Sequence, residues 1–296
     1  MADNNVTKLE LEDTKNIGGI RARRVIAYVV LVLISFLCLF WFYILFIYST
    51  RTHADMANGF RLWPKADFIK VFIENYNNLI FKSKLNIWAG LGNSVLIATS
   101  CAILSTYFST MTAYAIHAYE FKLKKFAFTF ILMVMMIPTQ VTALGFVDLI
   151  DDLNMDDTYF AVILPAIAAP ATFFYMKQYM DSTLPLAIIE AARIDGSGEF
   201  RTFNTIVLPM MKPAIAVQAI FTFVANWNNY FTPALVLDDI QTLPIQIATL
   251  RSFDVAMQDQ GMVYVMIVFS ILPVIVVYLF LSKFIVTGVA LGSVKG

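Results

Sequence analysis

Long apolar runs, separated by short polar segments, alternate along this 296-residue chain. A helix that crosses a bilayer needs about 20 mostly apolar residues, and six of the runs approach or exceed that length. We therefore predict an all-α polytopic membrane protein with six transmembrane helices. The runs cover residues 25–50, 91–118, 126–147, 159–179, 210–237 and 262–282.

The polar segments give the predicted organisation of the chain. A tail at 1–24 precedes the first transmembrane helix at 25–50; a loop at 51–88, with an amphipathic stretch from Phe68 to Tyr76, leads into a membrane core at 89–283 and a final tail at 284–296. If the N-terminus lies inside the cell, fourteen of the 21 Lys and Arg residues fall in inner segments. Inner segments are enriched in positive charge, so we predict that both termini are cytoplasmic and that the loop 51–88 is extracellular.

Composition supports the membrane assignment. The chain is 59% hydrophobic and 14% charged, with a mean hydropathy of +0.71, whereas a soluble domain has about 25% charged residues. The 21 Lys and Arg residues balance the 21 Asp and Glu residues, so no basic field attracts nucleic acid. Cys38 and Cys101 lie inside apolar runs, where cysteine serves as a small hydrophobic residue rather than as a disulfide or metal ligand.

Motifs of catalysis are missing from the sequence. No nucleotide-binding loop is present, and Gly196 and Gly198 lack the third glycine and the preceding strand of a dinucleotide site. The two histidines, His53 and His117, lie far apart. We therefore predict that the chain is not an enzyme and holds no metal or cofactor of its own. The central portions of the six runs also lack Asp, Glu, Lys and Arg, which disfavours an ion-coupled carrier.

Uncharged polar residues do occur inside the runs. Four of them recur at spacings that share one face of the fifth helix: Gln218, Thr222, Asn226 and Asn229. Gln140 follows Pro138, which breaks the third run. We predict that these five polar residues line a translocation path for a hydrogen-bonding solute. The alternative is that the amides join neighbouring helices by hydrogen bonds.

A polar island interrupts the apolar pattern between the fourth and fifth runs. Residues 190–209 read E-A-A-R-I-D-G-S-G-E-F-R-T-F-N-T-I-V-L-P, the composition of two short helices and a turn. Gly196 suits the left-handed position that closes the first helix. Ser197 is predicted to cap the second helix, with Glu199 in its first turn. Leu208-Pro209 is predicted to end it.

This island resembles the EAA loop of bacterial ABC import permeases. The resemblance implies a type I ABC importer permease fold and a cytoplasmic loop, here 181–209, that docks into a separate ATPase subunit. The coupling residues that it implies are Glu190, Ala191, Ala192, Asp195, Gly196, Ile206, Leu208 and Pro209.

The resemblance covers about residues 89–296 and is greatest to the maltose-transporter type of permease. Further matches are Gly92-Asn93-Ser94, Asn154 with Thr158, and the tail Gly288–Gly296. It implies one half of the path of an ATP-driven carbohydrate importer, for oligosaccharides or disaccharides, in the bacterial cytoplasmic membrane. The implied partners are a second, non-identical permease, a homodimeric or heterodimeric ATPase that binds Mg-ATP, an extracellular solute-binding protein or lipoprotein, the carbohydrate and membrane lipid.

Other functions stay open at this point. The same architecture also suits a polyol or glycerophosphodiester importer, and a membrane scaffold without a transport role is a more distant alternative. The resemblance also implies two further contact sites. In the loop 240–252, Thr242, Gln246 and Thr249 are predicted to contact the binding protein, the alternative being a loop folded onto its own membrane domain. In the tail, Gly292, Lys295 and Gly296 are predicted to reach the ATPase.

Overall fold

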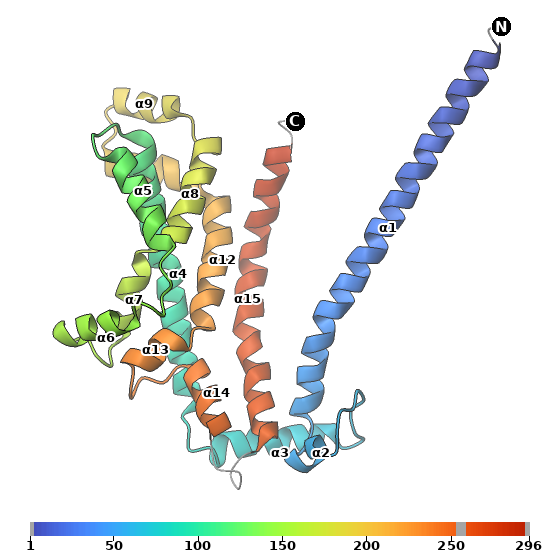
Figure 1. Cartoon of the computed structure of the whole chain (residues 1–296), viewed down its shortest axis with the longest axis vertical. Coiled ribbons are helices and arrows are strands. Elements are labelled where there is room, and N and C mark those ends of the chain that lie inside the picture. Colours follow the sequence, from blue (N-terminus) through green and yellow to red (C-terminus); the bar gives the residue numbers. More distant parts are fainter. Residues whose placement is uncertain (1–2, 253–258, 294–296) are drawn as a thin grey trace. The chain divides into compact units, whose positions relative to one another are not determined.

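The computed structural model describes residues 3–252 and 259–293 (Figure 1). All regular structure within these ranges is helical. The helices are α1 Asp3–Ser49, α2 His53–Ala57, α3 Phe68–Phe81, α4 Ile87–Ala118, α5 Lys124–Met135, α6 Ala143–Asp152, α7 Tyr159–Ile167, α8 Pro170–Thr183, α9 Leu186–Ile194, α10 Glu199–Thr202, the π-helix Phe203–Val207, α11 Leu208–Met210, α12 Lys212–Trp227, α13 Phe231–Val236, α14 Leu243–Ser252 and α15 Gln260–Ser293.

Four segments of the described chain are long and apolar enough to cross a membrane. They are Arg23–Ser49, Ile87–Ala118, Tyr159–Thr183 and Gln260–Lys283. The pair Glu199–Met210 and Lys212–Trp227 makes a fifth if the two bent helices are counted as one span. α1 begins at Asp3, so the helix already includes most of the polar segment that precedes the first apolar run.

The third predicted span is not one helix. The run at 126–147 forms α5, which has 12 residues, and then α6, with a turn at 136–142 between them. At 1.5 Å per residue, α5 is about 18 Å long and falls short of the hydrocarbon core of about 30 Å. Pro138 explains the break, since its ring has no N–H to donate and clashes with a helical neighbour.

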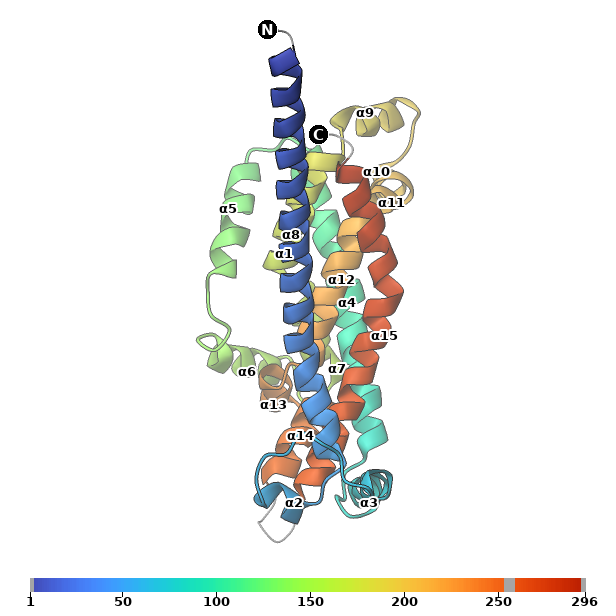
Figure 2. The ribbon, with the colours of Figure 1, turned by 90° about the vertical axis from the view of Figure 1, so that its right-hand side faces the viewer.

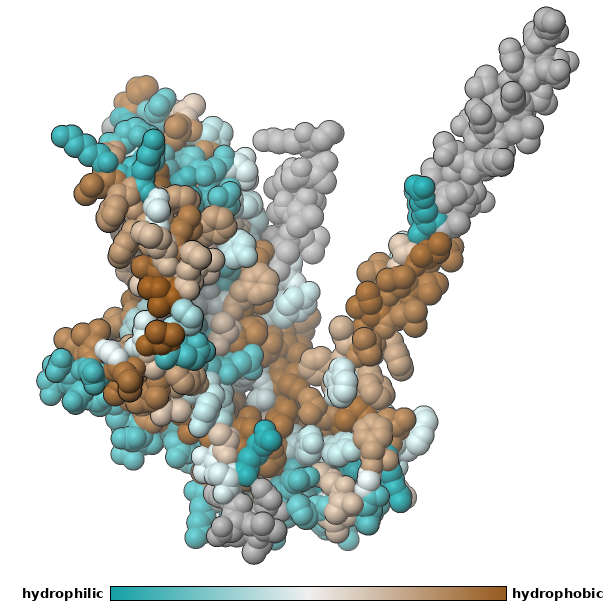
Figure 3. All heavy atoms as spheres, in the orientation of Figure 1, coloured by the Kyte–Doolittle hydropathy of each residue, from teal (hydrophilic) through white to brown (hydrophobic). Residues whose placement is uncertain are grey.

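The chain divides into two compact units. The first comprises Met1–Asn78 and Asp259–Val268. Here Asn75 of α3 is buried and donates through Nδ2 to the carbonyl oxygens of Ser49 and Arg51, both at 2.9 Å. The first bond satisfies a carbonyl group that the last turn of α1 leaves unpaired, and the second satisfies one in the turn that follows it. The surface of the apolar part of α1 is formed by the helix's own hydrophobic side chains (Figure 3).

The second unit, Leu79–Gln258 with Phe269–Gly296, is built around α4. α4 packs along α12, α8 and α7 (Figure 2). Small residues on its buried faces, such as Ala98, Cys101 and Ala102, let the neighbouring helices approach closely. Thr106 donates to the carbonyl oxygen of Ala102 at 2.6 Å, so its hydroxyl is satisfied within the helix. This unit contains the polar island, α12 and α14.

Candidate functional site

The turn of the polar island closes α9 as the sequence predicts. Gly196 has φ +76°, its N–H donates to the Arg193 carbonyl at 3.0 Å, and the Ser197 N–H donates to the Ala192 carbonyl at 2.9 Å. These two bonds form a complete Schellman motif. Gly196 therefore has the left-handed conformation that the sequence predicts, in which a residue with a side chain would be strained.

The second half of the island departs from the prediction in two ways. Gly198, not Ser197, is the N-cap of α10, because the Ser197 hydroxyl accepts a bond from the Thr202 hydroxyl at 2.8 Å instead. The helix also does not end at Leu208-Pro209. It passes through the π-helix into α11, whose first turn accommodates Pro209, and the chain then bends by 81° into α12.

One face of α9 packs inward and the opposite face is exposed. Ile189 and Ala192 are buried, with 1% and 6% of their surface exposed. Glu190 and Ala191 are exposed, and Ile194 is 86% exposed. The E-A-A sequence is therefore split, with its second alanine in the core and its carboxylate and first alanine on the surface. α9 lies at one end of the second unit (Figure 1).

Polar contacts behind this surface hold the two halves of the island together. The Glu199 carboxylate accepts from Arg193 Nε at 2.7 Å and from the Tyr114 hydroxyl at 2.7 Å. The Arg193 guanidinium also lies over the Tyr119 ring, 5.1 Å from its centroid. The hydrogen bond to Glu199 raises the pKa of Arg193 above its ordinary value. α9 and α10 are thus tied to each other and to α4.

The sequence reasoning did not single out these anchoring residues. Arg193 and Glu199 stand on either side of the glycine turn, and opposite charges flanking a turn are a local signal that was available. Tyr114 is 85 positions from Glu199 in the chain, and no local pattern links the two. The remaining predicted coupling residues belong to the same segment: Asp195 is the exposed C-cap of α9, Ile206 and Leu208 are half-buried, and Pro209 is exposed.

Two of the predicted path residues line a common cavity. It has a volume of about 240 Å³ and lies between α7, the end of α12, α13 and the turn before α6. No side chain lining it is ionisable: the lining consists of Thr139, Thr142, Ala143, Phe146, Val162, Pro165, Ala166, Asn226, Asn229, Phe231, Thr232 and Leu235.

The other predicted path residues lie elsewhere. Gln218 is buried, with 7% of its surface exposed, and the Thr222 hydroxyl lies 3.5 Å from that of Thr172 on α8. The Thr222 contact joins α12 to α8, as the alternative of bonds between helices expects, whereas Gln218 is buried and does not line the cavity. Gln140 is exposed in the turn next to Thr139, beside the cavity rather than in its lining.

One carboxylate accepts three backbone hydrogen bonds from the loop before α14. Asp157, with φ 49°, accepts at Oδ1 from the backbone N–H groups of Asp238, Asp239 and Ile240 at 3.0, 3.1 and 3.0 Å. Three N–H donors on one oxygen are a strong, charge-assisted arrangement. This arrangement holds the segment that leads into α14.

α14 packs onto α4 through the residues predicted to contact a partner. Thr242 and Gln246 are buried, with 3% and 2% of their surface exposed, and Gln246 Nε2 donates to the Asn86 carbonyl at 2.9 Å. Thr249 is half-buried, and its hydroxyl donates to the Ile245 carbonyl at 3.0 Å. This conformation corresponds to the alternative of a loop folded onto its own membrane domain, so Thr242 and Gln246 do not present their side chains outward in it.

The tail prediction falls largely outside the described residues. Gly292 belongs to the last turn of α15, whereas Lys295 and Gly296 lie outside the described ranges. Within residues 3–252 and 259–293, no group of three or more His, Cys, Asp or Glu side chains is placed to hold a metal ion.

Comparison with known proteins relates this arrangement to a protein family. A family model described as "Binding-protein-dependent transport system inner membrane component" matches residues 112–289. An arabinooligosaccharides transport system permease protein of Halalkalibacterium halodurans is 35% identical over 271 residues, 89% of this chain and 93% of that protein. An sn-glycerol-3-phosphate transport system permease protein of Brucella abortus is 33% identical over 223 residues, 73% and 79% of the two chains.

A solved structure shares the fold. It is a chain of a bacterial ABC transporter involved in the import of the acidic polysaccharide alginate, with a TM-score of 0.72, 21% identity and coverage of 89% of this chain and 96% of that one.

Proposed function

The chain belongs to the family of binding-protein-dependent transport system inner membrane components, and we propose that it is the permease subunit of an ATP-driven importer of oligosaccharides or disaccharides. Members of this family are multi-pass proteins of the cytoplasmic membrane, in agreement with the apolar helices of this chain. The subunit forms one half of the translocation path, and a second, non-identical permease forms the other half.

The proposed coupling to an ATPase rests on the exposed face of α9. Glu190 and Ala191 lie on a helix whose opposite face is buried and whose turn is held by the bonds between Arg193 and Glu199. An outward carboxylate beside a small residue suits an arginine fork in a groove of a partner. The partner ATPase binds Mg-ATP and docks here, which puts α9 in the cytoplasm. The excess of Lys and Arg in the inner segments supports a cytoplasmic side for both termini as well. The tail at Gly292–Gly296 adds a second contact.

The uncharged cavity supports a neutral cargo. Its hydroxyl and amide groups, from Thr139, Thr142 and Asn226 among others, bond to sugar hydroxyls, and Phe146 and Phe231 offer apolar surfaces. The relative that transports arabinooligosaccharides agrees with this cargo. The second candidate is a glycerophosphodiester or polyol, favoured by the glycerol-3-phosphate relative. A buried phosphate needs a cationic partner, which the lining of this cavity lacks.

On the other side of the membrane, we expect a solute-binding protein to deliver the sugar. α14 follows the path helices directly, and Thr249 is its least buried predicted contact residue. Thr242 and Gln246 reach such a partner only if α14 leaves its place on α4, so their contact requires a second conformation.

Reconstitution tests the whole proposal. The permease pair, its ATPase and its binding protein are incorporated into proteoliposomes, and uptake of labelled arabino-oligosaccharides, disaccharides, polyols and glycerophosphodiesters is measured with and without ATP. We expect ATP-dependent uptake of a neutral saccharide. Uptake of the phosphodiester alone favours the second candidate, and ATP-independent uptake of every solute contradicts coupling.

A further inference from the structure

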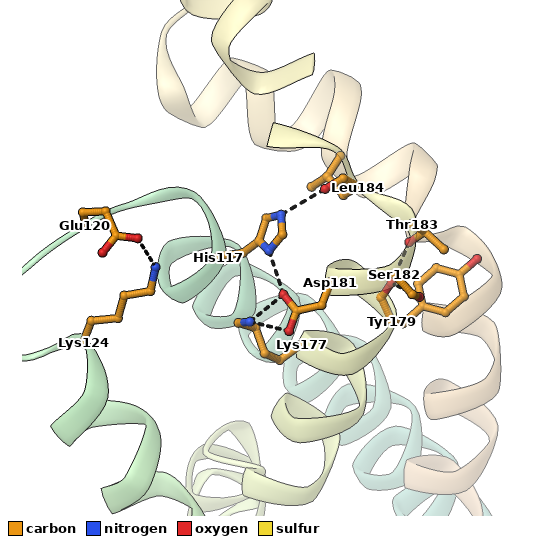
Figure 4. A network of polar contacts seen from close by, with 9 residues as sticks. All are labelled: His117, Glu120, Lys124, Lys177, Tyr179, Asp181, Ser182, Thr183 and Leu184. Atoms are coloured by element: carbon orange, nitrogen blue, oxygen red, sulfur yellow. Dashed lines mark hydrogen bonds and ion pairs between the residues drawn. The ribbon is translucent and has the colours of Figure 1, made fainter. Parts of the chain in front are cut away.

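His117 occupies the end of α4, where it faces two oxygen atoms of the α8–α9 junction (Figure 4). Its Nδ1 lies 2.8 Å from Asp181 Oδ1, and its Nε2 lies 3.0 Å from the carbonyl oxygen of Leu184. The ring is mostly buried, with 11% of its side-chain surface exposed. His117 therefore bridges α4 to both the last turn of α8 and the residue that follows it.

Both oxygen atoms are hydrogen-bond acceptors. The Leu184 carbonyl has no proton to give, and the Asp181 carboxylate accepts from Lys177 Nζ at 2.6 Å on each of its oxygens, which holds it in the ionised form. A neutral imidazole has one N–H and one lone pair, whereas the imidazolium has two N–H donors. Two acceptors at hydrogen-bond distance are satisfied together only by the imidazolium.

His117 lies in the last turn of α4, the end at which a helix dipole attracts a cation. The ring and the Lys177 ammonium share the Asp181 Oδ1 atom (Figure 4). Glu120 and Lys124, drawn in the same view, pair with each other at 2.7 Å.

The Leu184 carbonyl is a well-placed point of attachment. Leu184 is the C-cap of α8, and the next residue, Pro185, is the N-cap of α9 and has no N–H. The hydroxyl groups of Ser182 and Thr183 bond to the Tyr179 carbonyl within α8. The contact from His117 thus joins the end of α4 to the peptide at which α8 passes into α9, in addition to the packing of the Leu184 side chain in a core cluster with Tyr114 and Ile116 of α4.

From this geometry we propose that His117 is a positioning residue for coupling: as an imidazolium it clasps the α8–α9 junction to α4. The proposal rests on the proposed function, because it concerns the helix that docks on the ATPase. Loss of the proton leaves one N–H for two acceptors. Since a carboxylate is the stronger acceptor, that N–H stays with Asp181 and the Leu184 carbonyl is released.

The protonation state is tested independently of transport. The chain has two histidines, so 15N-histidine is incorporated into this subunit alone, in the assembled transporter in lipid. His53→Gln removes the other ring signal. We expect His117 to show two protonated ring nitrogens at about pH 7. A neutral ring with a single N–H at that pH overturns the proposal, whether or not the transporter works.

The coupling role is tested in proteoliposomes by the ratio of sugar uptake to ATP hydrolysed. His117→Phe, which removes both ring contacts, is expected to lower this ratio about threefold relative to wild type, the scale of one hydrogen bond. His117→Arg, which keeps at least two donors and a positive charge, should hold the ratio close to wild type. His53→Gln is the matched control and should follow wild type.

The outcomes separate the two proposals. A wild-type ratio in His117→Phe refutes the clasp while leaving the importer function intact. Absence of ATP-driven uptake in every variant, wild type included, refutes the importer function, and the ring signals then still decide the protonation of His117. If His117→Phe does not fold, His117→Gln replaces it, since a glutamine amide keeps a donor without the charge and should also lower the ratio.

Discussion

The side-chain amide of Gln246 fills the space that a Cβ atom on Gly90 would occupy. Gly90 lies near the start of α4 and Gln246 in the middle of α14, and the same amide donates to the Asn86 carbonyl at 2.9 Å. The absence of a side chain at position 90 therefore leaves room for the Gln246 amide between α14 and α4.

We expect Gly90→Ala to displace the Gln246 amide, to break its bond to the Asn86 carbonyl and to destabilise the chain by about 1–3 kcal/mol, the usual range for overpacking. The control is Gly92→Ala, because Gly92 has open space around it in the same helix and alanine favours helix formation. Thermal unfolding of the purified transporter measures both. Equal midpoints for the two variants would show that the Gln246 contact does not stabilise the fold.

Gly196 provides a test of the turn between α9 and α10. At φ +76° an alanine is strained and a β-branched residue more so, so Gly196→Val should reduce co-purification with the ATPase and sugar uptake more than Gly196→Ala does. Gly198→Ala is the control, since Gly198 has an ordinary φ of −68° and open surroundings. A loss as large at position 198 as at 196 argues against the left-handed turn as the cause.

Glu190 tests the docking surface itself. Its side chain is exposed, so Glu190→Arg should leave the unfolding midpoint unchanged within about 0.5 kcal/mol and abolish co-purification with the ATPase. Glu199→Gln should instead lower the unfolding midpoint, because it weakens the bond to Arg193. It leaves the exposed carboxylate of Glu190 in place. Normal uptake by Glu190→Arg contradicts the proposed role.

The cavity beside α12 gives a matched pair of amides. Asn226 donates to the Thr222 carbonyl at 2.9 Å and lines the cavity, whereas Asn228 makes the equivalent bond to the Val224 carbonyl at 3.0 Å and is not part of its lining. We expect Asn226→Leu to raise the KM for sugar about tenfold, the scale of one or two lost hydrogen bonds. Asn228→Leu should leave KM close to wild type, and equal effects of the two changes would exclude the cavity as the path.

Local chemistry explains which parts of the fold could be predicted. Gly196 was assigned a left-handed turn because few other residues adopt that conformation, and the structure has it. Ser197 was assigned as a cap by the same kind of rule, but its hydroxyl bonds to Thr202, five residues along. Pro138 indicated a break in the third run, yet not that α5 and α6 would be separate helices.

Contacts between distant parts of the chain account for what was missed. From the sequence alone, Gln246 is a polar residue that a partner could contact. Its amide is buried in the space beside Gly90, which lies far from it in the sequence. Tyr114 belongs to an apolar helix, and its bond to Glu199 appears only when α4 is packed against α10. Asn226 and Asn229 were placed on one helical face by their spacing, and the cavity they line depends also on residues 139–146.

The residue at position 157 must meet two separate structural requirements. Its backbone, with φ 49°, lies in a region that Gly, Asn and Asp enter most readily. Its side chain must also offer an oxygen to three consecutive N–H groups of residues 238–240. Glycine meets only the first requirement, and serine or glutamate only the second. Aspartate and asparagine alone meet both, so natural variation at this site should be confined to these two residues, whatever sugar a given relative carries.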